Sequence, residues 1–140
     1  MEKATEHQIW ESITCLIVDD DKFSRTFIKA ALSHIGIKNT REAATSNEAA
    51  EILNSNTIDI ILLDQQMPHK SGLDFAKELK SGSLGTTQNI PIIMVTIETK
   101  EKTVMDAKSL GIQEYLVKPI SPLALKKRIK SALELKNNTE

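Results

Sequence analysis

The chain contains a single cysteine, Cys15, which lies inside an apolar run. A disulfide framework is therefore excluded, and a lone thiol in such a run is typical of proteins from a reducing compartment. Long apolar segments are also missing, since no stretch approaches the roughly 18–20 residues of a membrane-spanning helix. Residues 1–11 are polar and lack the apolar centre of a signal peptide. We therefore expect a cytoplasmic protein that does not interact with a membrane.

The chain also lacks an excess of charge of either sign. Its 18 Lys and Arg residues are balanced by 19 Asp and Glu residues, which gives a net charge of -1. This balance provides no electrostatic reason to expect direct binding to nucleic acid. The 5 glycines form neither a G-x-G-x-x-G pattern nor a P-loop, so nucleotide binding is a weak hypothesis.

Two alternating patterns are present instead. Short runs rich in branched aliphatic residues predict strands that are buried on both faces. They cover residues 15–18, 58–63, 90–97 and 115–117, with a weaker candidate at 38–43. Between them, apolar residues recur at helical spacing, which predicts helices near residues 23–34, 46–53, 73–79, 103–110 and 122–133. Asp21, Ser46 and Ser121 are the expected helix caps.

Strand and helix alternate five times, which predicts an α/β domain of 140 residues or fewer with a parallel sheet and helices on both faces. Right-handed crossovers limit such a domain to a few doubly wound topologies. We assign residues 14–135 to this domain. Residues 1–13 form an N-terminal extension with a short helix near Ile9 and Trp10, and residues 136–140 form a C-terminal tail.

Polar residues follow several of the predicted strands at the point where each strand ends. Ligands of open parallel sheets bind beyond the carboxyl ends of the strands, so we expect these side chains to lie close together. They are Asp19, Asp20 and Asp21 after the first strand, Asp64 after the third, Thr96 at the end of the fourth, and Lys118 after the fifth.

Such a cluster of acids has a predictable chemistry. Carboxylates held close together repel one another and take up protons unless a cation intervenes. A hard divalent cation with oxygen ligands, Mg²⁺ or Mn²⁺, relieves that repulsion. One carboxylate next to the cation can then accept a phosphoryl group, with a lysine and a hydroxyl stabilising the transferred charge.

Four motifs complete the pattern: LIVDDD at 16–21, LLDQQMP at 62–68, VT at 95–96 and VKP at 117–119. Together they resemble the signatures of receiver domains of two-component response regulators, among which the chemotaxis and sporulation receivers are familiar. The similarity extends from about residue 14 to residue 133. It implies a flavodoxin-like (βα)5 fold with the strand order 2-1-3-4-5.

The resemblance also implies which residues hold the metal and accept the phosphoryl group. Asp64 corresponds to the phosphoacceptor and to a metal ligand. Asp20 corresponds to the acid that binds Mg²⁺ directly, and Asp19 to its neighbour that acts mostly through water. Gln66 occupies the position from which the family offers a backbone carbonyl to the metal.

A second group of residues corresponds to the phosphoryl-binding and switch positions of the family. Lys118 matches the lysine that pairs with phosphoryl oxygens, before a cis peptide at Pro119. Thr96 matches the hydroxyl that turns toward the phosphoryl group. Tyr115 matches an aromatic switch residue, although simple packing on an edge strand is an equal alternative for it.

Two residues depart from the family pattern. Ile97 stands where a small residue is usual, and we expect it to crowd the phosphoryl site and to slow self-phosphorylation from small donors. Gln65 stands where an aliphatic residue is commoner, and the sequence gives no account of it. Gln66 and Glu98 flank the site in the family and tune dephosphorylation there, while their effect in this chain is open.

The implied function is signalling through phosphorylation. A histidine kinase or histidine phosphotransfer protein would donate the phosphoryl group, and the chain would catalyse only its own phosphorylation and hydrolysis. A downstream protein would bind the face made by the helix at 103–110, the strand at 115–117 and the helix at 122–133. That face is also a possible homodimer contact. The chain is either a stand-alone regulator or a receiver cut from a larger protein.

Three alternatives stay open. An aspartyl-phosphate phosphatase would need a second acid two residues after the nucleophile, where this chain has Gln66. A degenerate receiver that only docks on a partner is supported by Ile97 alone. The basic residues on the last predicted helix form either a solvated face or a partner face; they are Lys126, Lys127, Arg128 and Lys130.

Overall fold

A computed structural model of the chain describes residues 4–85 and 89–134. Its elements follow the predicted alternation. They are α1 (Glu6–Ser12), β1 (Thr14–Val18), α2 (Lys22–Ile35), β2 (Asn39–Ala43), α3 (Ser46–Ser55), β3 (Ile60–Leu63), α4 (Gly72–Ser81), β4 (Ile92–Thr96), α5 (Glu101–Ser109), β5 (Glu114–Val117) and α6 (Pro122–Ala132). Across these two described ranges, no helix combines the length and the apolar character needed to cross a membrane. The predicted C-terminal tail, 136–140, lies outside the described residues.

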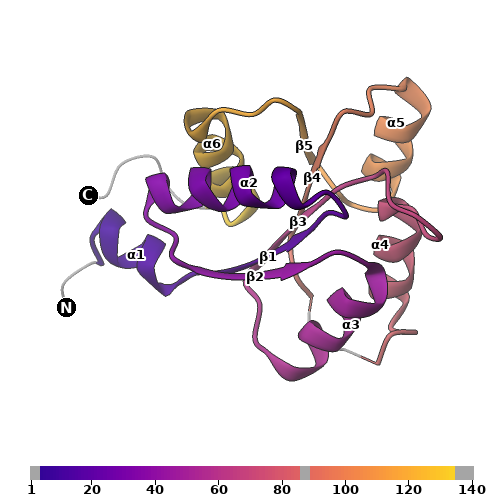
Figure 1. Ribbon diagram of the computed structural model, residues 1–140, viewed down its shortest axis with the longest axis horizontal. Helices are drawn as coiled ribbons and strands as arrows, with labels where there is room; N and C mark the ends of the chain where they lie inside the picture. Colours follow the sequence, from indigo (N-terminus) through magenta and orange to yellow (C-terminus); the bar gives the residue numbers. More distant parts are fainter. Residues whose placement is uncertain (1–3, 86–88, 135–140) are drawn as a thin grey trace.

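The five strands form one parallel sheet in the order β2-β1-β3-β4-β5 (Figure 1). In the register of the sheet, Val18 at the end of β1 pairs with Ala43 of β2 and with Leu63 of β3. Thr96 at the end of β4 pairs with Val117 of β5. The predicted doubly wound topology is therefore confirmed, and all of the strands end at the same edge of the sheet.

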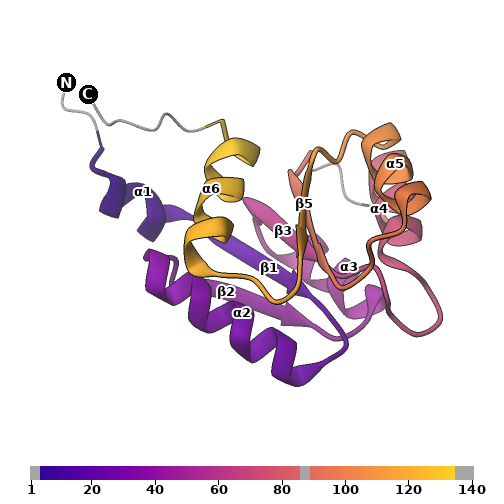
Figure 2. The same cartoon turned by 90° about the horizontal axis from the view of Figure 1, so that it is seen from above.

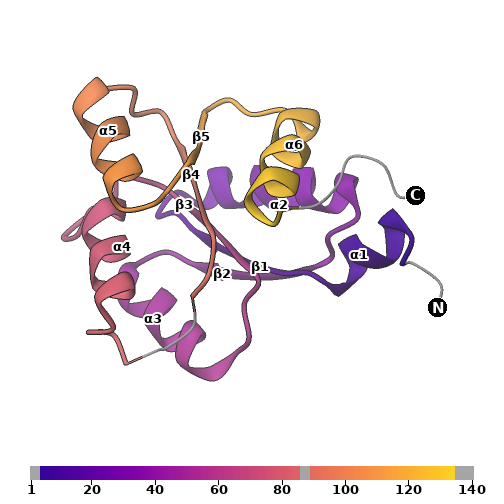
Figure 3. The ribbon, with the colours of Figure 1, turned by 180° about the vertical axis from the view of Figure 1, so that it is seen from behind.

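Helices cover both faces of the sheet, with α2 and α6 on one face and α3, α4 and α5 on the other (Figures 1 and 3). Successive residues along a strand point to opposite faces. Leu16 accordingly packs in the core beneath α3, α4 and α5, whereas Ile17 packs in the core beneath α2 and α6. Both side chains are fully buried, as expected for strands of nearly continuous apolar sequence.

The short N-terminal helix α1 extends the layer of α2 and α6 beyond the start of β1 (Figure 2). Thr5 begins it with a capping box. Trp10 is only 3% exposed and belongs to the same core cluster as residues of α2 and α6. Glu6 lies 2.9 Å from the Lys126 ammonium and 3.4 Å from that of Lys130, both on α6. The predicted helix near Ile9 and Trp10 is therefore present, and it packs onto the domain.

Three strands are shorter than predicted: β3, β4 and, by one residue, β2. β3 begins two residues later than expected, although the Asp59 N–H donates to the Thr14 carbonyl at 2.9 Å and the Asp59 carboxylate accepts the Thr14 N–H at 2.7 Å. β4 begins after Pro91, which has no N–H group to donate to a neighbouring strand. Backbone hydrogen bonds nevertheless reach the Pro91 carbonyl, which accepts the Ile61 N–H at 3.0 Å.

The helix caps agree with the sequence at two of three positions. Asp21 and Ser121 cap α2 and α6, each through a side chain that accepts a backbone N–H of the first turn. The predicted cap Ser46 was wrong. Thr45 precedes it and accepts the Glu48 N–H at 3.1 Å, so α3 starts one residue earlier than its first serine suggested. Either hydroxyl residue suits an N-cap, and spacing alone does not choose between them.

Candidate functional site

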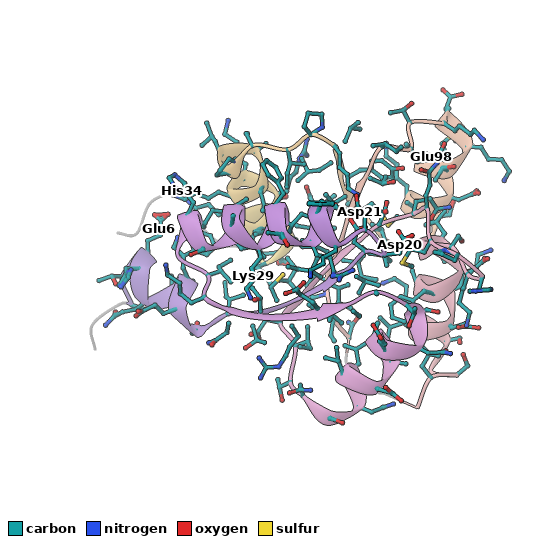
Figure 4. All side chains as sticks on the ribbon, in the orientation of Figure 1. Glu6, Asp20, Asp21, Lys29, His34 and Glu98 are labelled. Carbon is teal, nitrogen blue, oxygen red and sulfur yellow. The ribbon has the colours of Figure 1, made fainter. Side chains whose placement is uncertain are left out.

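Three carboxylates meet at the edge where the strands end. Asp19, Asp20 and Asp64 each offer an oxygen, and these oxygens lie within 4.8 Å of one another. Asp19 is 1% exposed and Asp64 is 6% exposed, whereas Asp20 faces solvent. Figure 4 shows Asp20 next to the start of α2, away from Glu6. The structure thus brings together acids that are up to 45 positions apart in the sequence.

Backbone hydrogen bonds fix the positions of two of these acids at the ends of their strands. The Asp19 N–H donates to the Ala43 carbonyl at 3.0 Å, and the Asp64 N–H donates to the Val18 carbonyl at 2.9 Å. Both residues therefore continue the strand ladder by one step while their side chains leave the apolar core. A buried strand of branched aliphatic residues ends in this way at a rigidly placed carboxylate.

Lys118 brings an ammonium group to the same acids from β5. Its Nζ lies 2.8 Å from Asp19 Oδ2 and 3.5 Å from Asp64 Oδ2, and its side chain is 20% exposed. Its backbone N–H donates to the Thr96 carbonyl at 2.9 Å, and the peptide bond to Pro119 is cis. One cation therefore stands between two nearly buried carboxylates, closer to Asp19 than to Asp64.

Two residues that the sequence did not single out also hold Asp19. The Ser24 hydroxyl donates to Asp19 Oδ2 at 2.5 Å, and Arg25 Nη1 donates to the Asp19 carbonyl at 2.8 Å. Arg25 Nε also lies 3.1 Å from Glu42 Oε1 on β2. Both residues belong to the start of α2, which follows the acidic run directly. That proximity was the only sequence signal that pointed to them.

The surroundings of Asp64 disfavour its charge. Burial raises the pKa of the Asp64 carboxyl above its ordinary value, and the nearby Asp19 charge raises it further. The Thr96 hydroxyl, the Lys118 ammonium and the Gln66 N–H lower this pKa, and they only partly compensate for burial. The Gln66 N–H itself lies 3.4 Å from Asp64 Oδ1. Asp64 is therefore a carboxylate whose negative charge a cation would relieve.

The donor set fits a hard divalent cation. All three acids supply carboxylate oxygens, which Mg²⁺ and Mn²⁺ prefer over the nitrogen and sulfur donors that select other metals. The Asp20 carboxylate has no hydrogen bond or ion pair within the described part of the chain, and it faces solvent, from which a hydrated ion would arrive. The Gln66 carbonyl as a further ligand stays a prediction.

Thr96, Glu98 and Tyr115 are joined by hydrogen bonds beside the acids. The Thr96 hydroxyl oxygen accepts the Glu98 N–H at 3.2 Å. The Tyr115 hydroxyl donates to the Glu98 carbonyl at 2.8 Å, and burial raises the pKa of Tyr115. Gln66 Nε2 donates to Glu98 Oε1 at 3.2 Å. Tyr115 is thus anchored through its hydroxyl as well as through packing, and it connects β5 to the segment that follows Thr96.

The two departures from the family pattern have different surroundings. Gln65 Oε1 accepts the Leu73 N–H at 2.8 Å and the Gln65 carbonyl accepts the Gly72 N–H at 3.0 Å, so Gln65 ties β3 to the start of α4. A Cβ at Gly72 would lie 2.2 Å from the Asp64 carbonyl oxygen, so only glycine fits there. Ile97 follows Thr96 directly and is 62% exposed. Its effect on phosphorylation stays a prediction.

Comparisons with known proteins agree with this geometry. The sequence profile of the response regulator receiver domain matches residues 15–130. Chemotaxis protein CheY1 of Helicobacter pylori is 37% identical over 119 residues, which cover 84% of this chain and 94% of that protein. Chemotaxis protein CheY of Pseudomonas aeruginosa is 33% identical over 122 residues, which cover 87% and 97% respectively.

Solved structures show the same fold. Chemotaxis protein CheY4 of Vibrio cholerae superposes with a TM-score of 0.76 at 30% identity, over 86% of this chain and 98% of that chain. A chain in the CheX-CheY-BeF3-Mg²⁺ complex of Borrelia burgdorferi superposes with a TM-score of 0.76 at 26% identity, over 85% of this chain and 87% of that chain. The match thus includes nearly the whole sheet and its helices.

Proposed function

The chain belongs to the response regulator receiver domain family, and from this premise we propose that it accepts a phosphoryl group on Asp64 from a phosphohistidine. A histidine kinase or a histidine phosphotransfer protein would be the donor. The observation that supports this most directly is the position of Asp64, a nearly buried carboxylate beside two further acids and one lysine. The chain would act as a signalling receiver and would catalyse only its own phosphorylation and dephosphorylation.

In the proposed transfer, an Asp64 oxygen forms a bond to phosphorus while the bond from phosphorus to the donor imidazole nitrogen breaks. The nitrogen keeps the electron pair of that bond. Lys118, whose Nζ lies 3.5 Å from Asp64 Oδ2, would pair with the oxygens of the transferred group. The Thr96 hydroxyl, which lowers the pKa of Asp64, would donate to the same group.

Asp19, Asp20, Asp64 and the backbone carbonyl of Gln66 would hold Mg²⁺, or Mn²⁺ in its place. When bound, the ion would neutralise the negative charge of the carboxylates and of the phosphoryl oxygens. The three clustered carboxylates support this assignment. So does the relative from Borrelia burgdorferi, whose crystallised complex includes Mg²⁺ and BeF3, a mimic of a phosphoryl group.

The phosphodonor would approach across the start of α2. Phe23 is 87% exposed and Phe27 is 52% exposed. They line an apolar groove together with Pro119 and Ile120, and Lys118 of the acidic site borders the same groove. Exposed aromatic residues next to a reactive group favour a protein partner over a small substrate.

The output would pass through α5, β5 and α6. The hydrogen bonds from the Glu98 N–H to Thr96 and from the Tyr115 hydroxyl to Glu98 support a route from the site to that face. Met105 on α5 and Val117 on β5 are 59% and 47% exposed, and they supply apolar surface for a downstream protein or a second copy of the chain. Ile97, Gln66 and Glu98 would tune access to the phosphoryl group. Phosphorylation would shift the population between two states of this face.

The test of this function is phosphorylation of the whole chain with acetyl phosphate or phosphoramidate and Mg²⁺, followed by intact mass spectrometry. We expect one added phosphoryl group on the wild type, none after removal of Mg²⁺ with EDTA, and none on Asp64→Ala. Asp74→Asn, which changes an exposed acid on α4, is the matched control and should be labelled like the wild type.

Two results would contradict the proposal. Labelling that persists in Asp64→Ala would exclude Asp64 as the acceptor. A wild type that binds neither Mg²⁺ nor BeF3 would instead favour a degenerate receiver that only docks on a partner. Sustained hydrolysis of phosphate esters, faster than the turnover of one aspartyl-phosphate, would favour the phosphatase alternative.

A further inference from the structure

Asp19 receives more hydrogen bonds than the other two acids of the site. Its Oδ2 accepts the Ser24 hydroxyl at 2.5 Å and the Lys118 ammonium at 2.8 Å. Its Oδ1 accepts the Asp21 N–H at 2.9 Å. One carboxylate oxygen is therefore shared between a neutral hydroxyl on α2 and a cation on β5.

This sharing matters for the proposed transfer, on which the following inference rests. Lys118 would move toward the oxygens of the phosphoryl group and away from Asp19. The Asp19 carboxylate is 1% exposed, and a buried charge that loses a donor without replacement is costly. Ser24 has no part in the transfer and stays in place on the helix.

The two donors also differ in their effect on a cation. The Lys118 ammonium repels a divalent ion that binds the same acid. The Ser24 hydroxyl carries no charge, so it can orient the carboxylate while leaving its attraction for the ion intact. A carboxylate that ligates a metal is commonly held by such a hydrogen bond from a neighbouring residue.

We propose that Ser24 is a positioning residue, which holds the Asp19 carboxylate in its metal-binding orientation independently of Lys118. Its location supports this role. Ser24 is half-buried in the first turn of α2, whose start is fixed by the Asp21 cap. The next residue, Arg25, binds the Asp19 carbonyl at 2.8 Å, so consecutive residues of one helix hold both the backbone and the side chain of Asp19.

The experiment measures binding of Mn²⁺ to the whole chain by electron paramagnetic resonance, with Mg²⁺ as a competitor. We expect Ser24→Ala to weaken Mn²⁺ binding by about tenfold, the lower end of the effect of removing such a supporting hydrogen bond. Ser24→Thr keeps the hydroxyl and should restore most of the affinity. Ser109→Ala, which removes an exposed hydroxyl from α5, should leave the affinity unchanged.

A purely structural role for Ser24 predicts a different pattern. In that case Ser24→Ala would lower the melting temperature of the cation-free protein, but the folded variant would have the same Mn²⁺ dissociation constant as the wild type. This result would overturn the inference. The proposed role also predicts that the defect of Ser24→Ala grows in the presence of BeF3, when Lys118 is drawn from Asp19. A defect that shrinks with BeF3 would count against it.

The same experiment separates this inference from the function that it presupposes. If the wild type binds Mn²⁺ and Ser24→Ala binds it equally well, only the role of Ser24 is wrong. If the wild type does not bind Mn²⁺, or if Asp64→Asn does not weaken this binding, the metal site itself is wrong. The role of Ser24 is then rejected with it.

Discussion

At the scale of single residues, the surroundings of Asp64 disfavour its negative charge. Burial raises its pKa above the ordinary value, and Lys118 and Thr96 only partly compensate. The folded protein therefore binds a proton at Asp64 more tightly than the unfolded chain does. At a pH above the folded-state pKa the ionised group costs stability, and this cost disappears as the pH falls through that pKa.

Asp64→Asn removes this charge and keeps the shape of the side chain. Without divalent cations at pH 7, we expect this variant to have a higher free energy of unfolding than the wild type, because it does not bury a charge at this position. The difference should narrow as the pH is lowered through the raised pKa of Asp64, because the wild type then binds a proton at this carboxyl. Urea denaturation in EDTA over this pH range measures both effects.

Asp74→Asn is again the control, because Asp74 is exposed on α4 and its pKa is not part of this argument. A stability difference for Asp64→Asn that stays constant with pH would contradict the role of the charge. A variant that is less stable than the wild type at pH 7 would contradict it more directly.

Residues at strand ends could be placed from the sequence, whereas residues on a helix could not. Asp19, Asp64 and Lys118 follow runs that predict strands, and neighbouring parallel strands necessarily end at one edge of the sheet. Ser24 reaches the same place from α2. Its approach depends on how that helix rotates and packs, which the spacing of apolar residues defines only coarsely.

At the scale of secondary-structure elements, α1 is the feature least determined by its own sequence. A helix of 7 residues is not stable by itself in water, so its order depends on contacts with the rest of the domain. Trp10 supplies the main contact. Trp10 is 3% exposed. It packs so closely against Gly36 that a Cβ added to Gly36 would lie 3.2 Å from the Cβ of Trp10.

We therefore expect Trp10→Ala to lower the free energy of unfolding by about 3–5 kcal/mol, the usual cost of removing a buried tryptophan side chain. Glu6→Gln, which weakens the partly exposed ion pairs to α6, should cost about 1 kcal/mol or less. His7→Ala changes an exposed position of the same helix and is the control. Urea denaturation followed by circular dichroism compares the three variants, and a small effect of Trp10→Ala would mean that α1 is dispensable.

The ion pairs of α6 give its basic residues a role beside the two alternatives that the sequence left open, a solvated face and a partner face. Lys126 and Lys130 pair with Glu6 of α1, and Arg128 lies 3.4 Å from Glu114 of β5. These side chains therefore hold neighbouring elements of the chain together. Sequence spacing placed them on one helix, but it could not show that acidic residues from two other elements would lie beside them.

At the scale of the whole molecule, the fold connects the acidic edge to a distant face through few residues. Thr96 ends β4 beside Asp64, and Tyr115 lies on β5, the neighbouring edge strand. Their common partner is Glu98, which receives the Tyr115 hydroxyl at its carbonyl and offers its N–H to Thr96. Gln66 donates its N–H to Asp64 and its Nε2 to Glu98, so a change at Asp64 has a hydrogen-bonded path to Tyr115 on β5.

Occupation of the site should first stabilise the whole domain. With Mg²⁺ at about ten times its dissociation constant, the free energy of unfolding should rise by about 1.4 kcal/mol, because the ion binds the folded state alone. Binding of BeF3 with Mg²⁺ should add to this value. It should also increase the protection of backbone amides against hydrogen exchange in the segment from Ile97 to Lys100 and in α5.

Tyr115→Phe separates these two effects. The variant keeps the ring that packs against the core on the α3, α4 and α5 side of the sheet, but it loses the hydroxyl that donates to Glu98. We expect it to retain the stabilisation by Mg²⁺ and BeF3, since the acids are untouched, and to lose most of the added amide protection in α5. Unchanged protection in α5 would show that packing alone transmits the signal, whereas loss of the stabilisation as well would place Tyr115 within the binding site itself.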